Sequence, residues 1–359
     1  MSHPILKIIN TDGCQSYLIG CPDTGDCLLV DPKVGNEDLY RSLMEHYQLE
    51  LTAVCDTHTH ADHLSAAPRL CDEDVPLWMS HHTTVARPME SMVPGEELMV
   101  GTMIFEVIEV PGHTPDSVAL HGEGLVLTGD SLFVGGLGRA DFIGSDPAQL
   151  FESVRKRLMR LPGNTLVLPG HGYNDLLFST IDSERELNEQ LRHANGEAYA
   201  AQLKATPGAG NSAAVNANLE MNLASNPNLP QSAGNAAACC ASPGGSTKVD
   251  IEEVAPPDAL SIRDSLSSSE QWIDVRDPFE YECGHIAGTT NIPLSELGFH
   301  LDRLRTQDRL YLSCRSGVRS MTAAKTLKRL GVVSTPVSIG GGILGWQDQG
   351  FPIEGMPAV

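Results

Sequence analysis

Residues 57–65 read THTHADHLS, and this short stretch decides how the first part of the chain is interpreted. It places His58, His60, Asp62 and His63 within six consecutive positions. Buried imidazole and carboxylate groups are costly unless they are paired, and both are common metal ligands. The apolar run that precedes them predicts a buried strand. The stretch therefore predicts a metal site on a loop that follows a strand, where functional residues often lie.

Three further strands are predicted to end at residues that can bind a metal ion. The run MIFEVIEVPGHT leads to His113, GLVLTGD leads to Asp130, and NTLVLPGHG leads to His171. Functional side chains concentrate on loops that a rigid scaffold positions. We therefore expect these three side chains to join the histidine cluster in one metal site.

Composition and charge exclude several classes of protein. The 359 residues are 41% hydrophobic and 19% charged, and the formal net charge is −22 with a pI near 4.8. An acidic surface disfavours binding to nucleic acid and to anionic membranes. The sequence has no apolar run of about 20 residues, the length of a membrane helix, and no signal or transit pattern at its start. Nine cysteines without a framework spacing indicate reduced thiols, so we expect a cytoplasmic protein.

The length of the chain predicts two domains. We assign residues 1–245 to the first. Alternating strands and helices in residues 248–359 predict a small parallel α/β domain. Residues 206–247 are rich in Ala, Asn, Gly, Pro and Ser, so we expect this segment to be irregular and linker-like.

The motifs HTHADH, PGHT, TGD and PGHG occur in this order and resemble those of the metallo-β-lactamase fold. The resemblance implies an αββα sandwich with metal at one edge of its two sheets. It covers about the first two-thirds of the chain. Because this fold hosts many chemistries, it does not by itself determine the reaction.

The ligand residues leave two arrangements open. In the dinuclear arrangement of hydrolases such as glyoxalase II, the ligands would be His58, His60 and His113 for one metal and Asp62, His63 and His171 for the other, with Asp130 between them. The alternative is a single iron ion on His58, His113 and Asp130. Two histidines and one carboxylate on one face leave three open positions, which suits Fe(II) that activates dioxygen.

Neighbouring residues favour the single iron ion. The segments HTHADHLSA, TGDSLFVGGLGRADF and HGY resemble the persulfide dioxygenases of the ethylmalonic-encephalopathy type. The resemblance implies one Fe(II) per chain on His58, His113 and Asp130, with Arg139 and Tyr173 near the glutathione moiety of the substrate. A guanidinium suits glutathione because it binds carboxylates bidentately. The other cluster residues would orient the ligands and tune the metal: His60, Asp62, His63 and His171.

The sequence departs from that family at three positions, where Thr59 stands for Cys, Ala140 for Thr and Gly172 for Asp. None of these changes removes a proposed iron ligand. The stretch that begins NPNLP, at residue 226, resembles the C-terminal tail of the family. Part of the linker-like segment is therefore expected to belong to the first domain.

A second site is predicted in the C-terminal domain, within YLSCRSGVRS. Cys314 lies between a predicted buried strand and the start of a helix, where backbone N–H groups and the helix dipole favour an anion. Arg315 and Arg319 add positive charge, so we expect a thiolate nucleophile. The C-x4-R loop is shorter than the C-x5-R loop of related phosphatases and resembles rhodanese, as do IDVRDPFEYECGHIAGTTNIPL and GGGILGWQDQGFPI. This resemblance covers nearly all of residues 249–359 and implies that Cys314 carries a sulfane sulfur.

Both predicted sites handle sulfur that is carried on a thiol. We therefore interpret the chain as a persulfide dioxygenase–rhodanese fusion. It would oxidise glutathione persulfide with O₂ to sulfite and glutathione, and it would transfer sulfur between thiosulfate and glutathione in either direction. All of these partners are small molecules. The resemblance further implies a homo-oligomer, with a dimer as the expected form.

Two alternative functions remain open at the level of the sequence. A dinuclear zinc hydrolase of glutathione thioesters, fused to a rhodanese, would bind two metals and act without oxygen. A non-enzymatic sulfur-relay module would bind glutathione or a partner in its first domain. It would show thiol transfer that depends on Cys314 and no metal-dependent activity.

Overall fold

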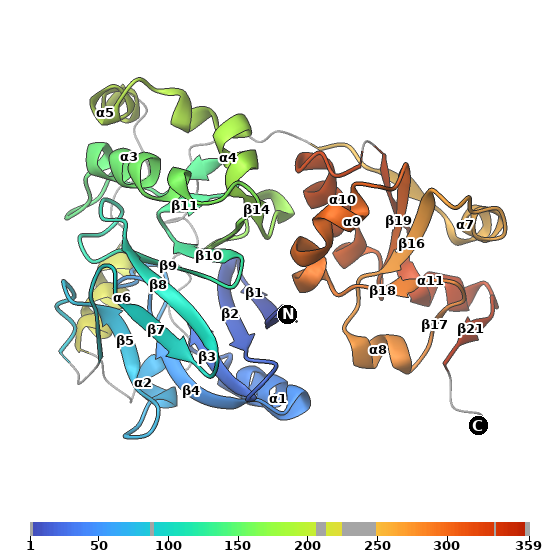
Figure 1. Ribbon diagram of the computed structural model, residues 1–359, viewed down its shortest axis with the longest axis horizontal. Coiled ribbons are helices and arrows are strands. Elements are labelled where there is room, and N and C mark those ends of the chain that lie inside the picture. Colours follow the sequence, from blue (N-terminus) through green and yellow to red (C-terminus); the bar gives the residue numbers. More distant parts are fainter. Residues whose placement is uncertain (1–2, 87–89, 206–212, 225–248, 334, 356–359) are drawn as a thin grey trace. The chain divides into compact units, whose positions relative to one another are not determined.

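The chain divides into two compact units, Met1–Gly245 and Ser246–Val359 (Figure 1). The first unit is built on two six-stranded sheets, and the second on a five-stranded sheet. The computed structural model describes residues 3–86, 90–205, 213–224, 249–333 and 335–355.

The first sheet of the N-terminal unit has the strand order β1-β2-β3-β4-β5-β6. Its first three strands pair antiparallel, and the pairs from β3 to β6 are parallel. The apolar runs of β2 and β3 are almost fully buried, as expected for strands covered on both faces. The six strands are Ile5–Thr11, Cys14–Gly20, Asp26–Val30, Glu50–Cys55, Leu77–Ser80 and Glu90–Met92.

The second sheet has the strand order β14-β13-β10-β9-β8-β7. Only β10 and β13 pair in parallel, and the other neighbours are antiparallel. Its strands are Glu97–Val100 (β7), Met103–Glu109 (β8), Val118–Gly122 (β9), Leu125–Gly129 (β10), Leu166–Pro169 (β13) and Ser179–Thr180 (β14). Two short strands, Leu132–Phe133 (β11) and Gly136–Leu137 (β12), pair antiparallel beside this sheet.

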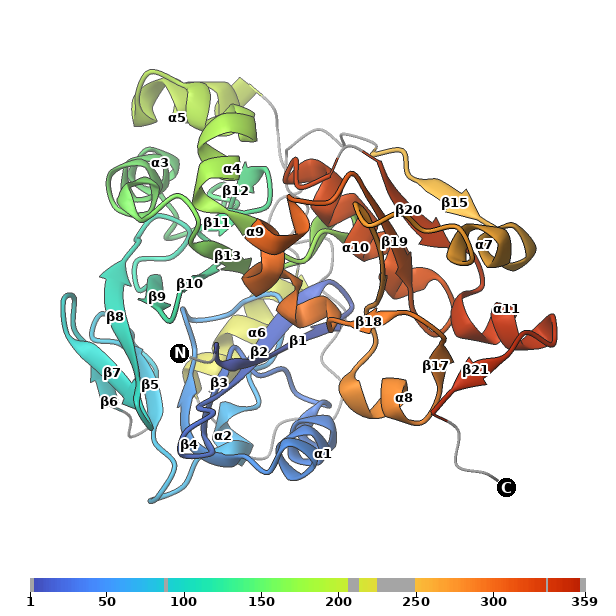
Figure 2. The same cartoon turned by 45° about the vertical axis from the view of Figure 1, so that its right-hand side comes forward.

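Helices cover the outer faces of both sheets (Figures 1 and 2). On the first sheet, Tyr40 of α1 is fully buried in a core cluster with Leu18 and Leu29. On the second sheet, Leu150 and Phe151 of α3 fill the corresponding core. The predicted αββα sandwich is therefore confirmed. The helices are α1 (Glu37–Tyr47), α2 (Ala67–Leu70), α3 (Pro147–Lys156), α4 (Ile181–Leu187) and α5 (Gly196–Ala205), with short 3₁₀ turns η1 (Leu158–Arg160), η2 (Tyr173–Asp175) and η3 (Glu189–Arg192).

The second unit is the predicted small parallel α/β domain, with the strand order β15-β20-β19-β16-β18. Trp272 and Trp346 are buried edge to face at its centre. The main strands are β15 (Glu252–Val254), β16 (Glu270–Asp274), β18 (Thr290–Asn291), β19 (Arg309–Ser313) and β20 (Pro336–Ile339), and β17 (His285–Ile286) pairs with β21 (Ile353–Glu354). The helices are α7 (Pro256–Arg263), α8 (Pro278–Glu282), η5 (Leu294–His300), α9 (Leu301–Leu304), α10 (Val318–Arg329) and α11 (Gly342–Asp348).

The expectation of an irregular segment over residues 206–247 is wrong for helix α6, Ala213–Ala224. The composition of the segment predicted a linker, and the residues of α6 give no amphipathic pattern that would have indicated a helix. Tertiary contacts stabilise the helix instead: Met221 packs against one core cluster and Leu223 against another. Two asparagines of α6 also bind the main chain of residues 57–65, the histidine loop. Residues 206–212 and 225–247, which include the NPNLP stretch, lie outside the described residues.

In the described part of the chain, none of the helices has the length and apolar character needed to cross a membrane. The cysteines of the same part are all free thiols. They are Cys14, Cys21, Cys27, Cys55, Cys71, Cys283 and Cys314.

Candidate metal centre and cysteine loop

The three residues predicted to hold iron come together beyond the ends of three strands. His58 follows β4, His113 follows β8 and Asp130 follows β10. The ligand atoms of this triad all lie within 4.8 Å of one another, and His113 Nε2 lies 3.6 Å from Asp130 Oδ2. Donors at these spacings can contact one ion, since imidazole and carboxylate ligands lie about 2.0–2.2 Å from a bound metal.

Hydrogen bonds donated by the Nδ1 atoms orient both histidines of the triad. His113 Nδ1 donates to the carbonyl oxygen of Arg139 at 2.8 Å. His58 Nδ1 lies 3.0 Å from Thr57 Oγ1. The Thr57 hydroxyl donates to Asp31 Oδ2 at 2.9 Å, so it accepts from the His58 ring. In these tautomers each ring keeps the lone pair on Nε2, as in histidines that bind a metal.

The Nε2 atom of His58 is buried and unsatisfied. The residue is only 2% exposed, and nothing in the described chain forms a hydrogen bond with this atom. Burial, together with the neighbouring His60, lowers the pKa of His58 to about 3. The ring is therefore neutral, which is the form that binds a metal. A buried polar atom without a partner costs free energy, and a metal ion at the triad would remove that cost.

Asp130 supplies the negative charge of the triad. Burial raises its pKa, but the neighbouring His171, His113 and His58 lower it more, so the pKa lies below the usual range. The backbone of Gly170 packs closely against this carboxylate. A Cβ at Gly170 would lie 2.3 Å from Asp130 Oδ1. The glycine before His171 in the PGHG motif therefore makes room for the carboxylate.

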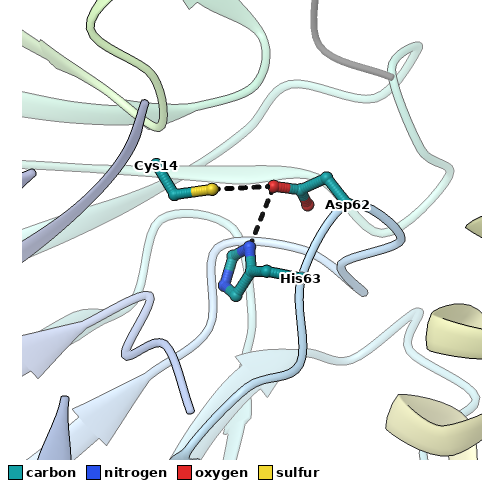
Figure 3. Close-up of side chains that lie close together, drawn as sticks. All are labelled: Cys14, Asp62 and His63. Carbon is teal, nitrogen blue, oxygen red and sulfur yellow. Dashed lines mark hydrogen bonds and ion pairs between the residues drawn. The ribbon is translucent and has the colours of Figure 1, made fainter. Parts of the chain in front are cut away.

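A second group of potential ligands adjoins the triad and consists of Cys14, Asp62 and His63 (Figure 3). Asp62 Oδ2 is its centre, 3.3 Å from Cys14 Sγ and 2.9 Å from His63 Nδ1. His171 Nε2 lies 3.4 Å from the same oxygen and 3.3 Å from Asp130 Oδ2. His171 thus connects the two groups. The sequence did not single out Cys14, because it lies at the start of an otherwise ordinary strand.

His60 is directed toward other carboxylates than those of the triad. Its Nε2 atom lies 3.2 Å from Asp31 Oδ1 and 3.8 Å from Asp56 Oδ1, and all three residues are buried. Burial and the neighbouring His63 lower the pKa of His60, but Asp31 and Asp56 outweigh them and the pKa is raised. His60 therefore pairs with Asp31, and more distantly with Asp56, rather than with the triad.

Asp116 ties the histidine loop to the loop of His113. Its Oδ2 atom accepts hydrogen bonds from Thr59 Oγ1 at 2.6 Å and from the Thr59 backbone N–H at 3.2 Å. Its Oδ1 atom accepts from Thr114 Oγ1 at 2.7 Å. This role of Asp116 was not predicted from the sequence. The signal was an aspartate three positions after His113, in the PGHTPD turn.

Helix α6 reaches the same loop through two asparagines. Asn222 Nδ2 donates to the carbonyl oxygens of His60 and His63, both at 2.8 Å, and Asn222 Oδ1 accepts from the backbone N–H of Ser65. Asn218 Nδ2 donates to the carbonyl oxygen of Asp62 at 3.2 Å. These contacts join residues more than 150 positions apart. No local sequence pattern could have predicted them.

The two predicted glutathione contacts lie near the metal loops. The Arg139 guanidinium forms a bidentate ion pair with Asp141, with distances of 2.8 and 3.0 Å. The Tyr173 ring stacks on His171 with 5.7 Å between ring centroids and meets Phe133 edge to face. Arg139 thus has a carboxylate partner of the kind that glutathione would offer.

Cys314 lies between β19 and α10, as the sequence predicted. It is 1% exposed, and its Sγ atom accepts a hydrogen bond from the backbone N–H of Gly317 at 3.2 Å. The start of α11 closes the loop from the other side, because the Ile343 N–H donates to the Cys314 carbonyl oxygen. A Cβ at Gly342 would lie 2.3 Å from that oxygen, so only glycine fits there.

The two arginines of the loop differ in their surroundings. Arg315 is exposed. Arg319 donates from both terminal nitrogens to Glu280, at 2.6 and 2.8 Å, and lies 3.7 Å from Asp277. These contacts raise the pKa of Arg319, with the hydrogen bond to Glu280 as the largest cause. The prediction that Arg319 adds positive charge to the loop therefore needs qualification, because Glu280 offsets part of that charge.

Comparisons with known proteins agree with both parts of the fold. The model of the metallo-beta-lactamase superfamily matches residues 9–171, and the model of the rhodanese-like domain matches residues 259–349. The first unit resembles "Persulfide dioxygenase ETHE1, mitochondrial" from Bos taurus, with 31% identity over 49% of this chain and 70% of the relative. It also resembles a hydroxyacylglutathione hydrolase from Anaeromyxobacter dehalogenans, with 36% identity over 45% of this chain and 63% of the relative.

A solved structure gives the same result. The crystal structure of ETHE1 from Myxococcus xanthus superimposes with a TM-score of 0.58 and 30% identity, and it covers 61% of this chain and 98% of that one. The persulfide dioxygenase thus matches in sequence and in structure, and the resemblance predicted from the sequence is confirmed. The chain belongs to the metallo-beta-lactamase superfamily, as a relative of the persulfide dioxygenase ETHE1 that also carries a rhodanese-like domain.

Proposed function

We propose that the first unit oxidises glutathione persulfide with O₂ at one iron ion, and that the second unit transfers sulfane sulfur as a rhodanese. The observation that carries the first part is the separate triad. His58, His113 and Asp130 converge on one point, whereas His60 is directed toward Asp31 and Asp56. Two imidazoles and one carboxylate with open positions beside them suit Fe(II) that activates O₂.

Iron fits the residues that are present. His58 offers a buried Nε2 atom without a partner, and Asp130 offers a carboxylate whose pKa lies below the usual range. Bound there, Fe(II) would supply the one-electron chemistry with O₂ that protein side chains lack. The chain itself holds His58 and His113 in the ligand tautomer through Thr57 and Arg139. The overall reaction converts glutathione persulfide, O₂ and water into glutathione, sulfite and two protons.

We assign the binding of the glutathione moiety to Arg139 and Tyr173. The Arg139 guanidinium already forms a bidentate ion pair with Asp141. A glutathione carboxylate would present the same pair of oxygens, so it could take the place of Asp141. Tyr173 stacks on His171 and so lies beside the metal centre.

The second unit would move sulfur through Cys314. Its thiolate attacks the outer sulfur of thiosulfate, the S–S bond of thiosulfate breaks, and sulfite leaves with the bonding electrons. A glutathione thiolate then attacks the outer sulfur of the Cys314 persulfide, which releases glutathione persulfide and restores the Cys314 thiolate. The N–H of Gly317, 3.2 Å from Sγ, stabilises the negative charge on sulfur. Both steps can run in reverse to make thiosulfate from persulfide and sulfite.

A second candidate for the first unit is a dinuclear zinc hydrolase of glutathione thioesters. The observation in its favour is the second group of donors, Asp62, His63 and Cys14, with His171 beside it. The similarity to a hydroxyacylglutathione hydrolase points the same way. Oxidation of glutathione persulfide at one Fe(II) ion remains our proposal, because the triad supplies two imidazoles and one carboxylate without any member of the second group.

The deciding experiment combines metal content with oxygen uptake on the purified full-length chain. We expect about one iron per chain, oxygen consumption on glutathione persulfide, and sulfite as the product. A sample stripped of metal by a chelator and an Asp130→Ala variant serve as controls, and both should lose oxygen uptake. About two zinc ions per chain, together with oxygen-independent thioester hydrolysis, would move the first unit to the hydrolases.

A further inference from the structure

His81, His82 and Glu109 form another group of potential metal ligands, at the surface of the first unit and outside the metal centre. Their ligand atoms all lie within 4.8 Å of one another. His82 Nε2 lies 3.1 Å from Glu109 Oε1, and His81 Nε2 lies 3.8 Å from the same oxygen. Two imidazoles and one carboxylate oxygen thus meet at a single point.

The surroundings hold these side chains in an arrangement typical of metal ligands. His81 Nδ1 lies 3.2 Å from the carbonyl oxygen of Met92, to which it donates. This bond leaves the lone pair of the His81 ring on Nε2, which faces Glu109. Backbone carbonyls play this role for many histidines that bind metals. The centroids of the two histidine rings lie 3.9 Å apart, and the Nε2 atoms of both rings face Glu109.

The two carboxylate oxygens of Glu109 have different partners. Its Oε2 atom lies 3.5 Å from Arg157 Nη1, whereas its Oε1 atom faces the two histidines. One carboxylate oxygen is therefore anchored and the other is available. The exposed fractions of the side chains are 20% for Glu109, 33% for His81 and 54% for His82. Water can reach the group and complete the coordination of a bound ion.

The position of the group in the fold suggests what a bound ion would do. The two histidines follow β5 of the first sheet, and Glu109 ends β8 of the second sheet, four positions before His113. Thr83, next to the two histidines, lies 3.3 Å from Thr59 of the histidine loop between their Oγ1 atoms. An ion bound here would connect the two sheets beside two loops of the metal centre.

We propose that His81, His82 and Glu109 bind a divalent transition-metal ion of the Zn²⁺ type, which links the two sheets. The nitrogen and oxygen donors suit Zn²⁺, Cu²⁺ or Ni²⁺. The net charge of −22 favours the approach of a cation. This site does not depend on which metal the triad holds, so it stands or falls separately from the proposed function.

The test measures Zn²⁺ binding and thermal unfolding of the purified full-length chain, with the triad occupied by whichever metal it retains. We compare the wild type with His82→Gln and, as a second variant, His81→Gln. The matched control is His121→Gln. His121 lies 3.9 Å from Glu106 and forms a histidine–carboxylate pair, but among the described residues it belongs to no group of three metal ligands. Other thiols and imidazoles bind equally in all samples, so the difference isolates the proposed site.

We expect the wild type and His121→Gln to bind one more Zn²⁺ than either site variant does. Zn²⁺ should also raise the unfolding temperature of those two proteins more than that of the site variants, because ligands that bind only the folded state stabilise it. His81 and His82 are partly exposed, so both variants should fold. Equal uptake of Zn²⁺ and an equal rise in unfolding temperature in all four proteins would overturn the proposal.

Discussion

The metal centre and the cysteine loop are built in opposite ways. The triad gathers His58, His113 and Asp130 from three separate loops, and Asn222 holds the first loop from a helix far along the chain. The cysteine loop is one continuous segment, in which the N–H of Gly317 reaches Cys314 only three positions away. The first site depends on side chains that converge, and the second mainly on the local path of the backbone, which α11 supports through the Ile343 N–H.

This difference predicts how each site responds to change. A site of converging side chains depends on residues that hold distant loops in place, so supporting contacts such as those of Asn222 should matter. A continuous loop at the start of a helix depends mainly on its own backbone and on its nucleophile. Substitutions in one unit should therefore leave the reaction of the other largely intact.

The largest effect is expected for Asp130→Ala. It removes the only charged ligand of the triad, so we expect nearly complete loss of bound iron and of oxygen uptake on glutathione persulfide. Metal analysis and an oxygen electrode measure both. Sulfur transfer from thiosulfate to glutathione should remain near the wild-type rate. If that transfer also disappears, the two sites are not independent.

Cys314→Ser should abolish sulfur transfer, with a loss of at least about a thousand-fold, because the hydroxyl cannot carry the sulfane sulfur. The assay follows sulfite release from thiosulfate in the presence of glutathione. Cys283→Ser is the matched control, since Cys283 is an exposed thiol of the same unit. Oxygen uptake on supplied glutathione persulfide should be unchanged in both variants. A Cys314→Ser protein that still transfers sulfur would contradict the proposed nucleophile.

Asn222→Ala tests whether the convergence of the metal centre depends on α6. Asn222 binds two carbonyl oxygens of the histidine loop, and removal of such a supporting contact typically lowers metal affinity about 10- to 100-fold. Iron affinity is measured by competition with a chelator. Asn218→Ala, which loses one contact at 3.2 Å, should have a smaller effect. Equal affinity in the wild type and both variants would show that α6 only covers the loop.

The most confined effect, a change of KM alone, is expected at Arg139. Loss of a charge-assisted hydrogen bond to the substrate costs about 1.5–3 kcal/mol, so Arg139→Ala should raise KM for glutathione persulfide at least about tenfold. The carbonyl oxygen that holds His113 stays in place, so kcat should change little. Asp141→Asn weakens the competing ion pair and should not raise KM. An equal fall of kcat in both variants would instead indicate a structural ion pair.

The sequence alone determined the fold class, the rhodanese-like loop and the order of the potential ligands. Strands and turns can be recognised from residues that are adjacent in the sequence, and the potential ligands directly follow the predicted strands. The C-x4-R loop could be interpreted because its residues are contiguous. Local sequence patterns did not predict α6, because its Asn-rich sequence lacks an apolar stripe. Contacts with loops far away in the sequence stabilise this helix instead.

Only the tertiary structure decided which ligand residues share a point. Sequence spacing could not separate the triad from Cys14, Asp62 and His63, or show that His60 is directed toward Asp31. It also could not show that Glu280 pairs with Arg319. The physical reason is the same in each case. The direction of a side chain depends on packing between elements far apart in the chain, whereas sequence periodicity reports only the local conformation of the backbone.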